Sequence, residues 1–283
     1  MEKNRLYLLS FADTRYKASL ERLEAYTRKF PFDKRLFLTE KDLSKEYLKK
    51  LKPWLYRRGY GYWAWKSYIV YQQLKKMNEG DILFYSDGGL YWNDKPTALK
   101  RFSEYVGLLS DKTDILAFEE DQPEYKWTKG DVFQELGVYD NDRICNSRQL
   151  LGGLWAIKKT VATVAFVKQW MELSDIEKEL VTDKKSIKPN KEGFVEHRHD
   201  QSIFSVMVKR VPHIAISSSE ISRELAEKGL LDEFPIQALR MKEQGRPWNI
   251  VLKNKLMRPW RMILNVYFRK IRGYHFAIGS YPW

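Results

Sequence analysis

Short apolar runs alternate with amphipathic helical patterns through the first 216 residues of the chain. Compact apolar runs between turn-forming residues are typical of strands, and apolar residues at i, i+3 and i+4 are typical of helices. The alternation predicts an α/β fold with a mainly parallel sheet flanked by helices. The expected strands lie near residues 5–11, 35–38, 81–86, 114–118, 149–157 and 213–216, and the expected helices near 17–29, 42–50, 64–77, 97–107, 161–179 and 198–210.

The pattern also indicates how the chain is divided. Residues 181–196 are polar and include Pro189 and Gly193, which predicts a long exposed loop that acts as a lid. A shift to basic and aromatic residues begins after residue 234. We therefore expect a catalytic or binding domain over residues 1–234 and a basic extension over 235–283.

The expected central strand ends in a candidate ligand site. Its apolar run is followed directly by Asp87, Gly88 and Gly89. In an open α/β sheet, ligands bind beyond the carboxyl ends of the strands, and glycines let the backbone approach a ligand closely. The alternative is a turn in which the carboxylate of Asp87 only caps the next segment.

Two charged residues on apolar helix faces are further candidates. Lys66 begins a helix on the same side as Trp63 and Val70, where a cation opposes the helix dipole unless an anion such as a diphosphate lies nearby. Asp200 lies in the middle of the apolar face of the helix near 198–210, and His197 and His199 come just before it along the chain. The simpler alternatives are a lysine whose ammonium reaches past the apolar face and an aspartate that caps the helix.

The charge is unevenly distributed and limits the function classes. The net charge is +13, from 50 Lys and Arg against 37 Asp and Glu. Ten of the positive residues, against one negative, follow residue 239, so the preceding body is nearly neutral. This disfavours a protein built throughout to bind nucleic acid, although the basic end keeps nucleic-acid binding open as the competing class, with a non-catalytic carbohydrate-binding protein as a third.

Cysteine usage and hydropathy point to a compartment. The single cysteine, Cys145, excludes an intrachain disulfide, and no stretch reaches the roughly 18 apolar residues that a membrane span needs. We expect a cytoplasmic protein whose contact with a membrane is peripheral.

Four segments in order resemble one family. They are residues 10–16 (SFADTRY), 61–66 (GYWAWK), 80–89 (GDILFYSDGG) and 197–202 (HRHDQS). Together they resemble bacterial glycosyltransferases of the GT-A fold that build capsular polysaccharide and lipopolysaccharide O-antigen, over roughly residues 3–216. The resemblance implies transfer of a hexose from a nucleotide-sugar donor to a saccharide or lipid-linked saccharide acceptor. UDP-sugars are the first expectation for the donor.

The resemblance also implies residues for the donor and for a metal. Asp87 stands where such enzymes carry an Asp-x-Asp motif that binds Mn²⁺ or Mg²⁺, but its neighbours Ser86, Gly88 and Gly89 supply no second carboxylate. Metal dependence is therefore open, and Lys66 and Arg198 are the alternative charges for a leaving diphosphate. The implied donor-binding residues are Phe11, Asp13, Arg15, Trp65, Lys66, Asp87, Gly88 and Arg198.

The acceptor is expected between the strand near 149–157 and the helix that carries Asp200. An inverting reaction needs a carboxylate base, for which Asp200 is the first choice and Glu119 the second, and the stereochemistry stays open. Trp155 and Trp127 are candidate aromatic platforms for a sugar, or else core residues. The expected acceptor-binding residues are Gln149, Gly152, Gly153, Trp155, His199 and Gln201.

The basic extension has its own pattern. Apolar residues recur at helical spacing from Leu252 to Ile271, and seven Lys and Arg residues occupy most of the remaining face. Such a helix is typical of a segment that lies on an anionic membrane surface, and we expect residues 252–274 to make that contact. The alternative is a helix that packs on the body with its basic face in water.

Overall fold

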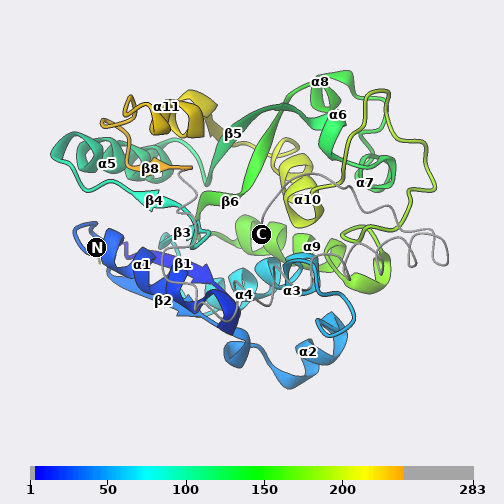
Figure 1. Ribbon diagram of the computed structural model, residues 1–283, viewed down its shortest axis with the longest axis horizontal. Helices are drawn as coiled ribbons and strands as arrows, with labels where there is room; N and C mark the ends of the chain where they lie inside the picture. The colour runs from blue at the N-terminus through cyan, green and yellow to red at the C-terminus, as the bar shows by residue number, and fades with distance from the viewer. Residues whose placement is uncertain (1–3, 239–283) are drawn as a thin grey trace, which may run out of the picture.

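The computed structural model describes residues 4–238, which fold around a six-stranded sheet (Figure 1). The strand order is β2-β1-β3-β6-β5-β7. Only β6 is antiparallel to its neighbours, while β1 pairs in parallel with β2 and β3, and β5 in parallel with β7. The strands are β1 (Leu6–Phe11), β2 (Lys34–Leu38), β3 (Ile82–Ser86), β5 (Ile115–Pro123), β6 (Arg148–Lys158) and β7 (Ile214–Ile216).

Helices cover both faces of this sheet. Alternate residues of each strand point to opposite faces, so Leu83 and Tyr85 of β3 enter one apolar cluster and Ile82 and Phe84 enter the other. The first cluster is closed by α4 (Trp65–Leu74), α7 (Gly130–Glu135), α9 (Val161–Leu173) and α10 (His199–Val208), and the second by α1 (Lys17–Thr27) and α5 (Pro96–Asp111). The expected α/β class, with a mainly parallel sheet flanked by helices, is confirmed.

Smaller elements complete the described part of the chain. They are α2 (Lys45–Leu51), α3 (Gly59–Tyr62), α6 (Glu124–Trp127), α8 (Asp142–Cys145), α11 (Arg223–Glu227) and the short 3-10 helices η1 (Thr14–Tyr16), η2 (Glu40–Asp42), η3 (Ile176–Lys178) and η4 (Ser218–Glu220). Strands β4 (Tyr91–Trp92) and β8 (Ile236–Gln237) pair in a second, two-stranded sheet.

The predicted domain boundary lies beside this small sheet. Ile236 and Gln237 are buried and pair with β4, so the packed body includes residues just beyond 234. The basic extension, including the predicted membrane contact at 252–274, lies outside the described residues. Within residues 4–238, no helix combines the length and the apolar character that crossing a bilayer requires.

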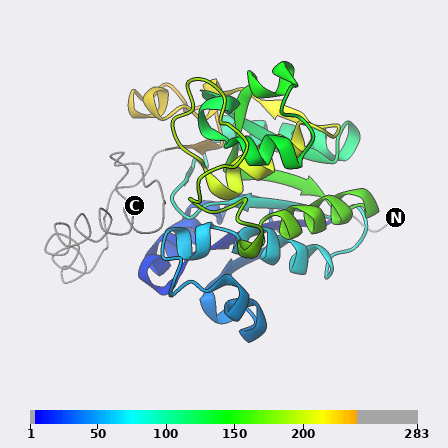
Figure 2. The same cartoon turned by 90° about the vertical axis from the view of Figure 1, so that its right-hand side faces the viewer.

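The segment 181–196 has neither helix nor strand, but it is not a free lid. Its first residues, Val181 to Asp183, are buried, and the Asp131 carboxylate accepts hydrogen bonds from the amides of Ile187 and Lys188 at 2.7–3.0 Å. Figure 2 shows this segment, in yellow-green, running along the outside of the body beside α9 and α10. The polar composition correctly indicated a loop, whereas its anchoring depends on partners far away in the sequence.

Candidate functional site

A cavity of about 870 Å³ opens at one edge of the main sheet. The parallel strands β3, β5 and β7 all end at this edge, and the antiparallel β6 begins there, so loops from four strands converge. The lining residues come from α3 and α4, the end of β3, the β5–β6 pair, the start of α10 and the segment after β7. They include Arg58, Trp63, Lys66, Asp87, Glu119, Glu120, Trp127, Arg148, Gly153, Glu196, Arg198, His199, Asp200, Gln201, Ser217, Ser218, Ser219 and Arg223.

Lys66 is the charged centre of this cavity. Its side chain is only 3% exposed, and its ammonium lies 2.7 Å from Oδ2 of Asp200 and 3.7 Å from Oδ1 of Asp87. The same ammonium donates a hydrogen bond to the carbonyl of Gly152 at 2.9 Å. Burial alone lowers the pKa of Lys66, but the two carboxylates outweigh it and raise the pKa. Lys66 is therefore a fixed positive charge, and its nearest anions are carboxylates of the protein itself.

Local backbone geometry places α4, and with it Lys66. Residues 59–63 before this helix all have positive φ, and Gly59 and Gly61 make two of those positions inexpensive. A Cβ on Gly61 would also lie 2.5 Å from Cδ1 of Leu51. The Trp65 indole N–H donates to the carbonyl of Gly59 at 2.9 Å, which ties this turn to the first residue of α4. The run of glycine and aromatic residues thus forms a compact turn that positions Lys66 at the cavity.

Asp87 extends from the end of β3 into the cavity. Its amide donates to the carbonyl of Gly153 on β6 at 2.8 Å, which continues the β3–β6 ladder by one residue. The Tyr85 hydroxyl donates to Oδ1 of Asp87 at 2.8 Å, and the Asp87 side chain remains 46% exposed. A Cβ on Gly153 would lie 2.4 Å from Oδ2 of Asp87, so a side chain at position 153 would compete for that space. Asp87 is the accessible carboxylate of the pair.

Asp200 lies in the first turn of α10 and is only 5% exposed. Burial raises its pKa to about 6, while the charge of Lys66 acts in the opposite direction. A carboxylate with this pKa is mostly ionised at neutral pH and still basic enough to accept a proton. The predicted burial of a carboxylate on the apolar face of this helix agrees with the structure, and Lys66 stabilises its charge.

The two histidines before Asp200 hold the start of α10 against the segment 174–196. His199 has φ +55°, and Nδ1 of its ring donates to the carbonyl of Val181 at 2.8 Å. Nε2 of His197 donates to the carbonyl of Leu180 at 2.8 Å. Burial lowers the pKa of both rings well below the usual value, so both are neutral. His199 borders the cavity, and its buried ring stacks on Tyr62.

A second cation, Arg198, borders the cavity. The Arg198 guanidinium lies 4.0 Å from the centroid of the Trp127 ring and 2.5 Å from Oε2 of Glu120. Gln201 follows on the same helix, and its Oε1 accepts a hydrogen bond from the amide of Gly152 at 3.1 Å. Arg198 is thus a partly exposed cation, and Arg198 and Gln201 both border the cavity.

Several predicted residues occupy other places. Trp155 is buried in the core, where its ring stacks on Tyr85, so it offers no open face to a sugar. Gln149 is also fully buried, because its amide donates to the buried carboxylate of Glu124 at 3.0 Å and accepts from Gln201. Both belong to the interior of the β6–α10 packing.

The predicted donor residues at the end of β1 lie outside the cavity lining. Phe11 is buried and stacks on Trp65, with ring centroids 4.0 Å apart. Asp13 caps η1 and pairs with Arg15 at 2.5 Å. Because β1 is the parallel neighbour of β3, these residues are at the same sheet edge as Asp87, beside the cavity.

Two further predicted residues have clear positions. Glu119 borders the cavity on β5 and lies 3.6 Å from Arg148. Gly88 lies against α1, where a Cβ would come within 2.6 Å of Oγ of Ser19. Glu119 therefore stays a candidate for acceptor chemistry, and the role of Gly88 is a close approach between the turn and α1.

Sequence reasoning missed part of the lining. Ser217, Ser218 and Ser219 directly follow β7, so the same rule that identified Asp87 after β3 points to them. Arg58 and Glu196 pair with each other across the cavity wall, 138 residues apart along the chain. No local pattern indicates such a pair, because it exists only after α3 and α10 have packed.

The site does not fit a divalent cation held by several protein ligands. Among the described residues, no group of three or more His, Cys, Asp and Glu side chains is arranged to hold a metal. Ser86 is buried and its hydroxyl accepts from the Trp92 indole, so it offers no ligand beside Asp87. The group that faces both Asp87 and Asp200 is the ammonium of Lys66.

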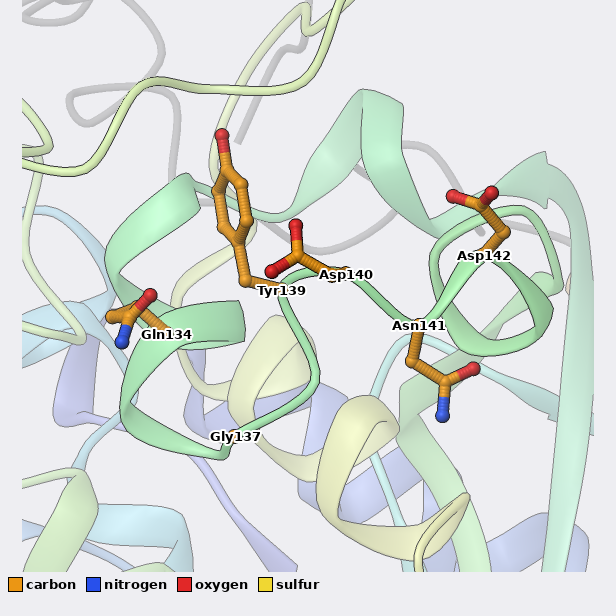
Figure 3. Close-up of a pocket in the computed structure, with 6 residues that line it drawn as sticks. All are labelled: Gln134, Gly137, Tyr139, Asp140, Asn141 and Asp142. Atoms are coloured by element: carbon orange, nitrogen blue, oxygen red, sulfur yellow. The ribbon is translucent and has the colours of Figure 1, made fainter.

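A second hollow, of about 550 Å³, lies between α7 and α8 (Figure 3). Asp140, Asn141 and Asp142 line it, and Figure 3 shows their side chains pointing in different directions rather than converging. Its lining contains no lysine or arginine, so it has no cation–carboxylate pair of the kind found in the larger cavity. The larger cavity is therefore the candidate site.

Solved structures of three glycosyltransferases are similar to this chain. A glycosyltransferase involved in the glycosylation of the major capsid of PBCV-1 is 12% identical, with a TM-score of 0.48, over 86% of this chain and 96% of its own. Mouse xyloside xylosyltransferase 1 is 12% identical, with a TM-score of 0.46, over 86% and 99%. The glycosyltransferase GlyE of Streptococcus pneumoniae is 15% identical, with a TM-score of 0.44, over 95% and 64%. No protein-family model and no curated protein sequence matches the chain.

Proposed function

We propose that this protein is a glycosyltransferase that moves a hexose from a nucleotide-diphosphate sugar, with UDP-sugars first, to a saccharide acceptor. The observation that carries the proposal is the Asp87–Lys66–Asp200 group at the carboxyl edge of an α/β sheet. A structural ion pair in a sheet protein needs neither a large cavity nor a half-exposed carboxylate. Here the group forms the wall of a cavity of about 870 Å³, which is large enough for a nucleotide sugar.

The reaction assigns a task to each charge. The acceptor hydroxyl attacks the anomeric carbon, the bond from that carbon to the diphosphate oxygen breaks, and the hydroxyl proton passes to a carboxylate. Asp200 is our first choice for this base, because its pKa of about 6 suits proton transfer at neutral pH, and Glu119 is the second. Lys66 and Arg198 supply positive charge for the departing diphosphate.

Ligand-induced stabilisation separates this proposal from the competing class. If the cavity binds a nucleotide sugar, UDP-sugars raise the melting temperature in proportion to the logarithm of ligand concentration over Kd. We expect stabilisation by one UDP-sugar or more, and none by single- or double-stranded oligonucleotides at physiological salt. Salt-sensitive stabilisation by oligonucleotides with no response to any nucleotide sugar would establish the nucleic-acid class instead.

The pH dependence of the reaction is a second expected result. Since the pKa of Asp200 is about 6, donor turnover is expected to rise with pH, with a midpoint near 6 and a plateau above it. The buried Asp183 also has a pKa of about 6, so the control is Asp183→Asn, which should keep the midpoint of the turnover profile.

The contribution of Asp200 to folding stability has the opposite pH dependence. The folded pKa of Asp200 exceeds its ordinary value of 3.8, so its contribution to folding is present below that value and is lost as the pH rises through about 6.

Acceptor and location complete the proposal. A lipid-linked saccharide acceptor in cell-surface polysaccharide synthesis would place the enzyme at the inner face of the membrane, and the basic residues of 252–274 suit that surface. Each basic residue near an anionic surface contributes about 1 kcal/mol, so replacing Lys253, Lys255, Arg258 and Arg261 by Gln should release the full-length protein from phosphatidylglycerol vesicles. Unchanged sedimentation with these vesicles would remove the membrane contact from the proposal. Phosphatidylcholine vesicles are the control.

A further inference from the structure

The Lys66 ammonium occupies the space between the two carboxylates of the site. It contacts Asp200 at 2.7 Å and Asp87 at 3.7 Å, and its side chain is 3% exposed. Divalent cations bind carboxylate oxygens at about 2.0–2.6 Å, so a metal bridging Asp87 and Asp200 would need the volume that the ammonium fills. A divalent metal placed between the two carboxylates would also be repelled strongly by the nearby Lys66 ammonium, because the site is poorly solvated.

We propose that Lys66 takes the place of a divalent cation, so that the site needs no Mn²⁺ or Mg²⁺ to meet an anionic ligand. That the Lys66 ammonium excludes a metal follows from the geometry. That it faces the diphosphate of a donor rests on the proposed function. Above a pH of about 6 the three groups together carry one net negative charge, because one ammonium faces two carboxylates.

Within residues 4–238, no group of three or more His, Cys, Asp and Glu side chains offers a metal another place. Oδ1 of Asp87 already accepts from the Tyr85 hydroxyl, and the Ser86 hydroxyl is engaged with Trp92. The His199 ring donates Nδ1 to Val181, and its Nε2 lies 3.6 Å from Oδ1 of Asp183, on the side of the segment 181–196. The Ser86 hydroxyl and Nδ1 of His199 are thus committed to other partners.

The position of Lys66 also explains why its charge is retained. A buried lysine without a partner loses its proton, whereas the two carboxylates raise the pKa of this one. The carbonyl of Gly152 accepts a further hydrogen bond and fixes the ammonium at the cavity wall. Lys66 thus supplies a permanent, immobile positive charge at the cavity wall without recruiting an ion.

Removal of the ammonium should convert the group into a metal site. In the full-length Lys66→Met variant, Asp87 and Asp200 face each other's charge without compensation, and we expect Mn²⁺ to bind about tenfold or more tightly than in the wild type. The gain should disappear in Lys66→Met/Asp200→Asn. The matched control is Lys158→Met, which removes a lysine that lies 2.9 Å from one carboxylate, Asp114, outside the cavity and should gain no Mn²⁺ site.

The measurement is the loss of the free Mn²⁺ electron paramagnetic resonance signal on titration with protein, without nucleotide. Wild-type protein that binds Mn²⁺ as tightly as Lys66→Met, or a Lys66→Met variant that gains no Mn²⁺ affinity, overturns the proposal. The wild-type protein supplies a second test that needs no folded variant. UDP should raise its melting temperature equally in EDTA and in Mn²⁺, and stabilisation that requires Mn²⁺ overturns the proposal.

These outcomes are distinct from failure of the proposed function. If UDP and UDP-sugars stabilise the protein in neither EDTA nor Mn²⁺, the proposed function fails. The Mn²⁺ titration of the wild type and of Lys66→Met still decides whether the ammonium holds the place of a cation.

Discussion

Replacing either carboxylate of the central group by its amide is expected to abolish glycosyl transfer. Asp87→Asn removes the exposed charge at the end of β3, and Asp200→Asn removes the group with the pKa suited to a base. Loss of a positioned proton acceptor costs about 10²- to 10⁴-fold in rate, so we expect a drop in this range for Asp200→Asn. Turnover of a UDP-sugar with its acceptor, followed by UDP release, is the measurement.

The fold should survive both substitutions. Asparagine keeps the shape of aspartate, and in either variant Lys66 still faces one carboxylate. A matched control is Asp94→Asn, because Asp94 is also half-exposed and pairs with a lysine, Lys29, at 2.9 Å, yet it lies outside the cavity. Full activity of both cavity variants, with circular dichroism and melting like the wild type, would remove these carboxylates from the mechanism.

Gly153→Ala is expected to reduce activity strongly with little loss of stability. The new Cβ would lie 2.4 Å from Oδ2 of Asp87, and the nearest atoms it meets are the end of a half-exposed side chain that is able to move away. The Asp87 carboxylate would then leave its place beside Lys66. Displacement of a reacting group by about 1 Å can cost about 10²-fold, which is the size of the expected effect on kcat/KM.

The control for Gly153→Ala is the same substitution at Gly89. A Cβ on Gly89, two residues after Asp87, meets nothing within 4 Å, so Gly89→Ala should retain activity. Melting temperatures of both variants separate a local displacement from unfolding. If Gly153→Ala is fully active while folded, the position of Asp87 beside β6 is irrelevant to the reaction.

The regular elements were predictable because their signals are local. All six expected strands and all six expected helices are present, and the apolar run before Asp87 is indeed a central strand, paired with β1 and β6. The rule for strand ends also pointed to Asp87, which follows β3 and borders the cavity. These features depend on periodicity and on turn residues within a few positions.

The partners of the charged residues were not predictable. The dipole argument correctly indicated that Lys66 needs an anion, but the anions are Asp87 and Asp200, one of them 134 residues away. Trp155 and Gln149 looked suitable for a sugar because their residue types are, yet the packing of α10 on β6 buries both. Burial and ion pairing are set by contacts between distant segments, and a single sequence carries no direct signal for them.

Nucleotide release shows directly whether the Asp87–Lys66–Asp200 cavity turns over a nucleotide sugar. Full-length protein is incubated with a panel of nucleotide sugars, and release of the nucleoside diphosphate is followed in EDTA for the wild type and for Asp87→Asn, Asp200→Asn and Asp94→Asn. We expect release from at least one donor by the wild type and by Asp94→Asn, with loss in the two cavity variants. Equal release by all four proteins, or release by none, would contradict it.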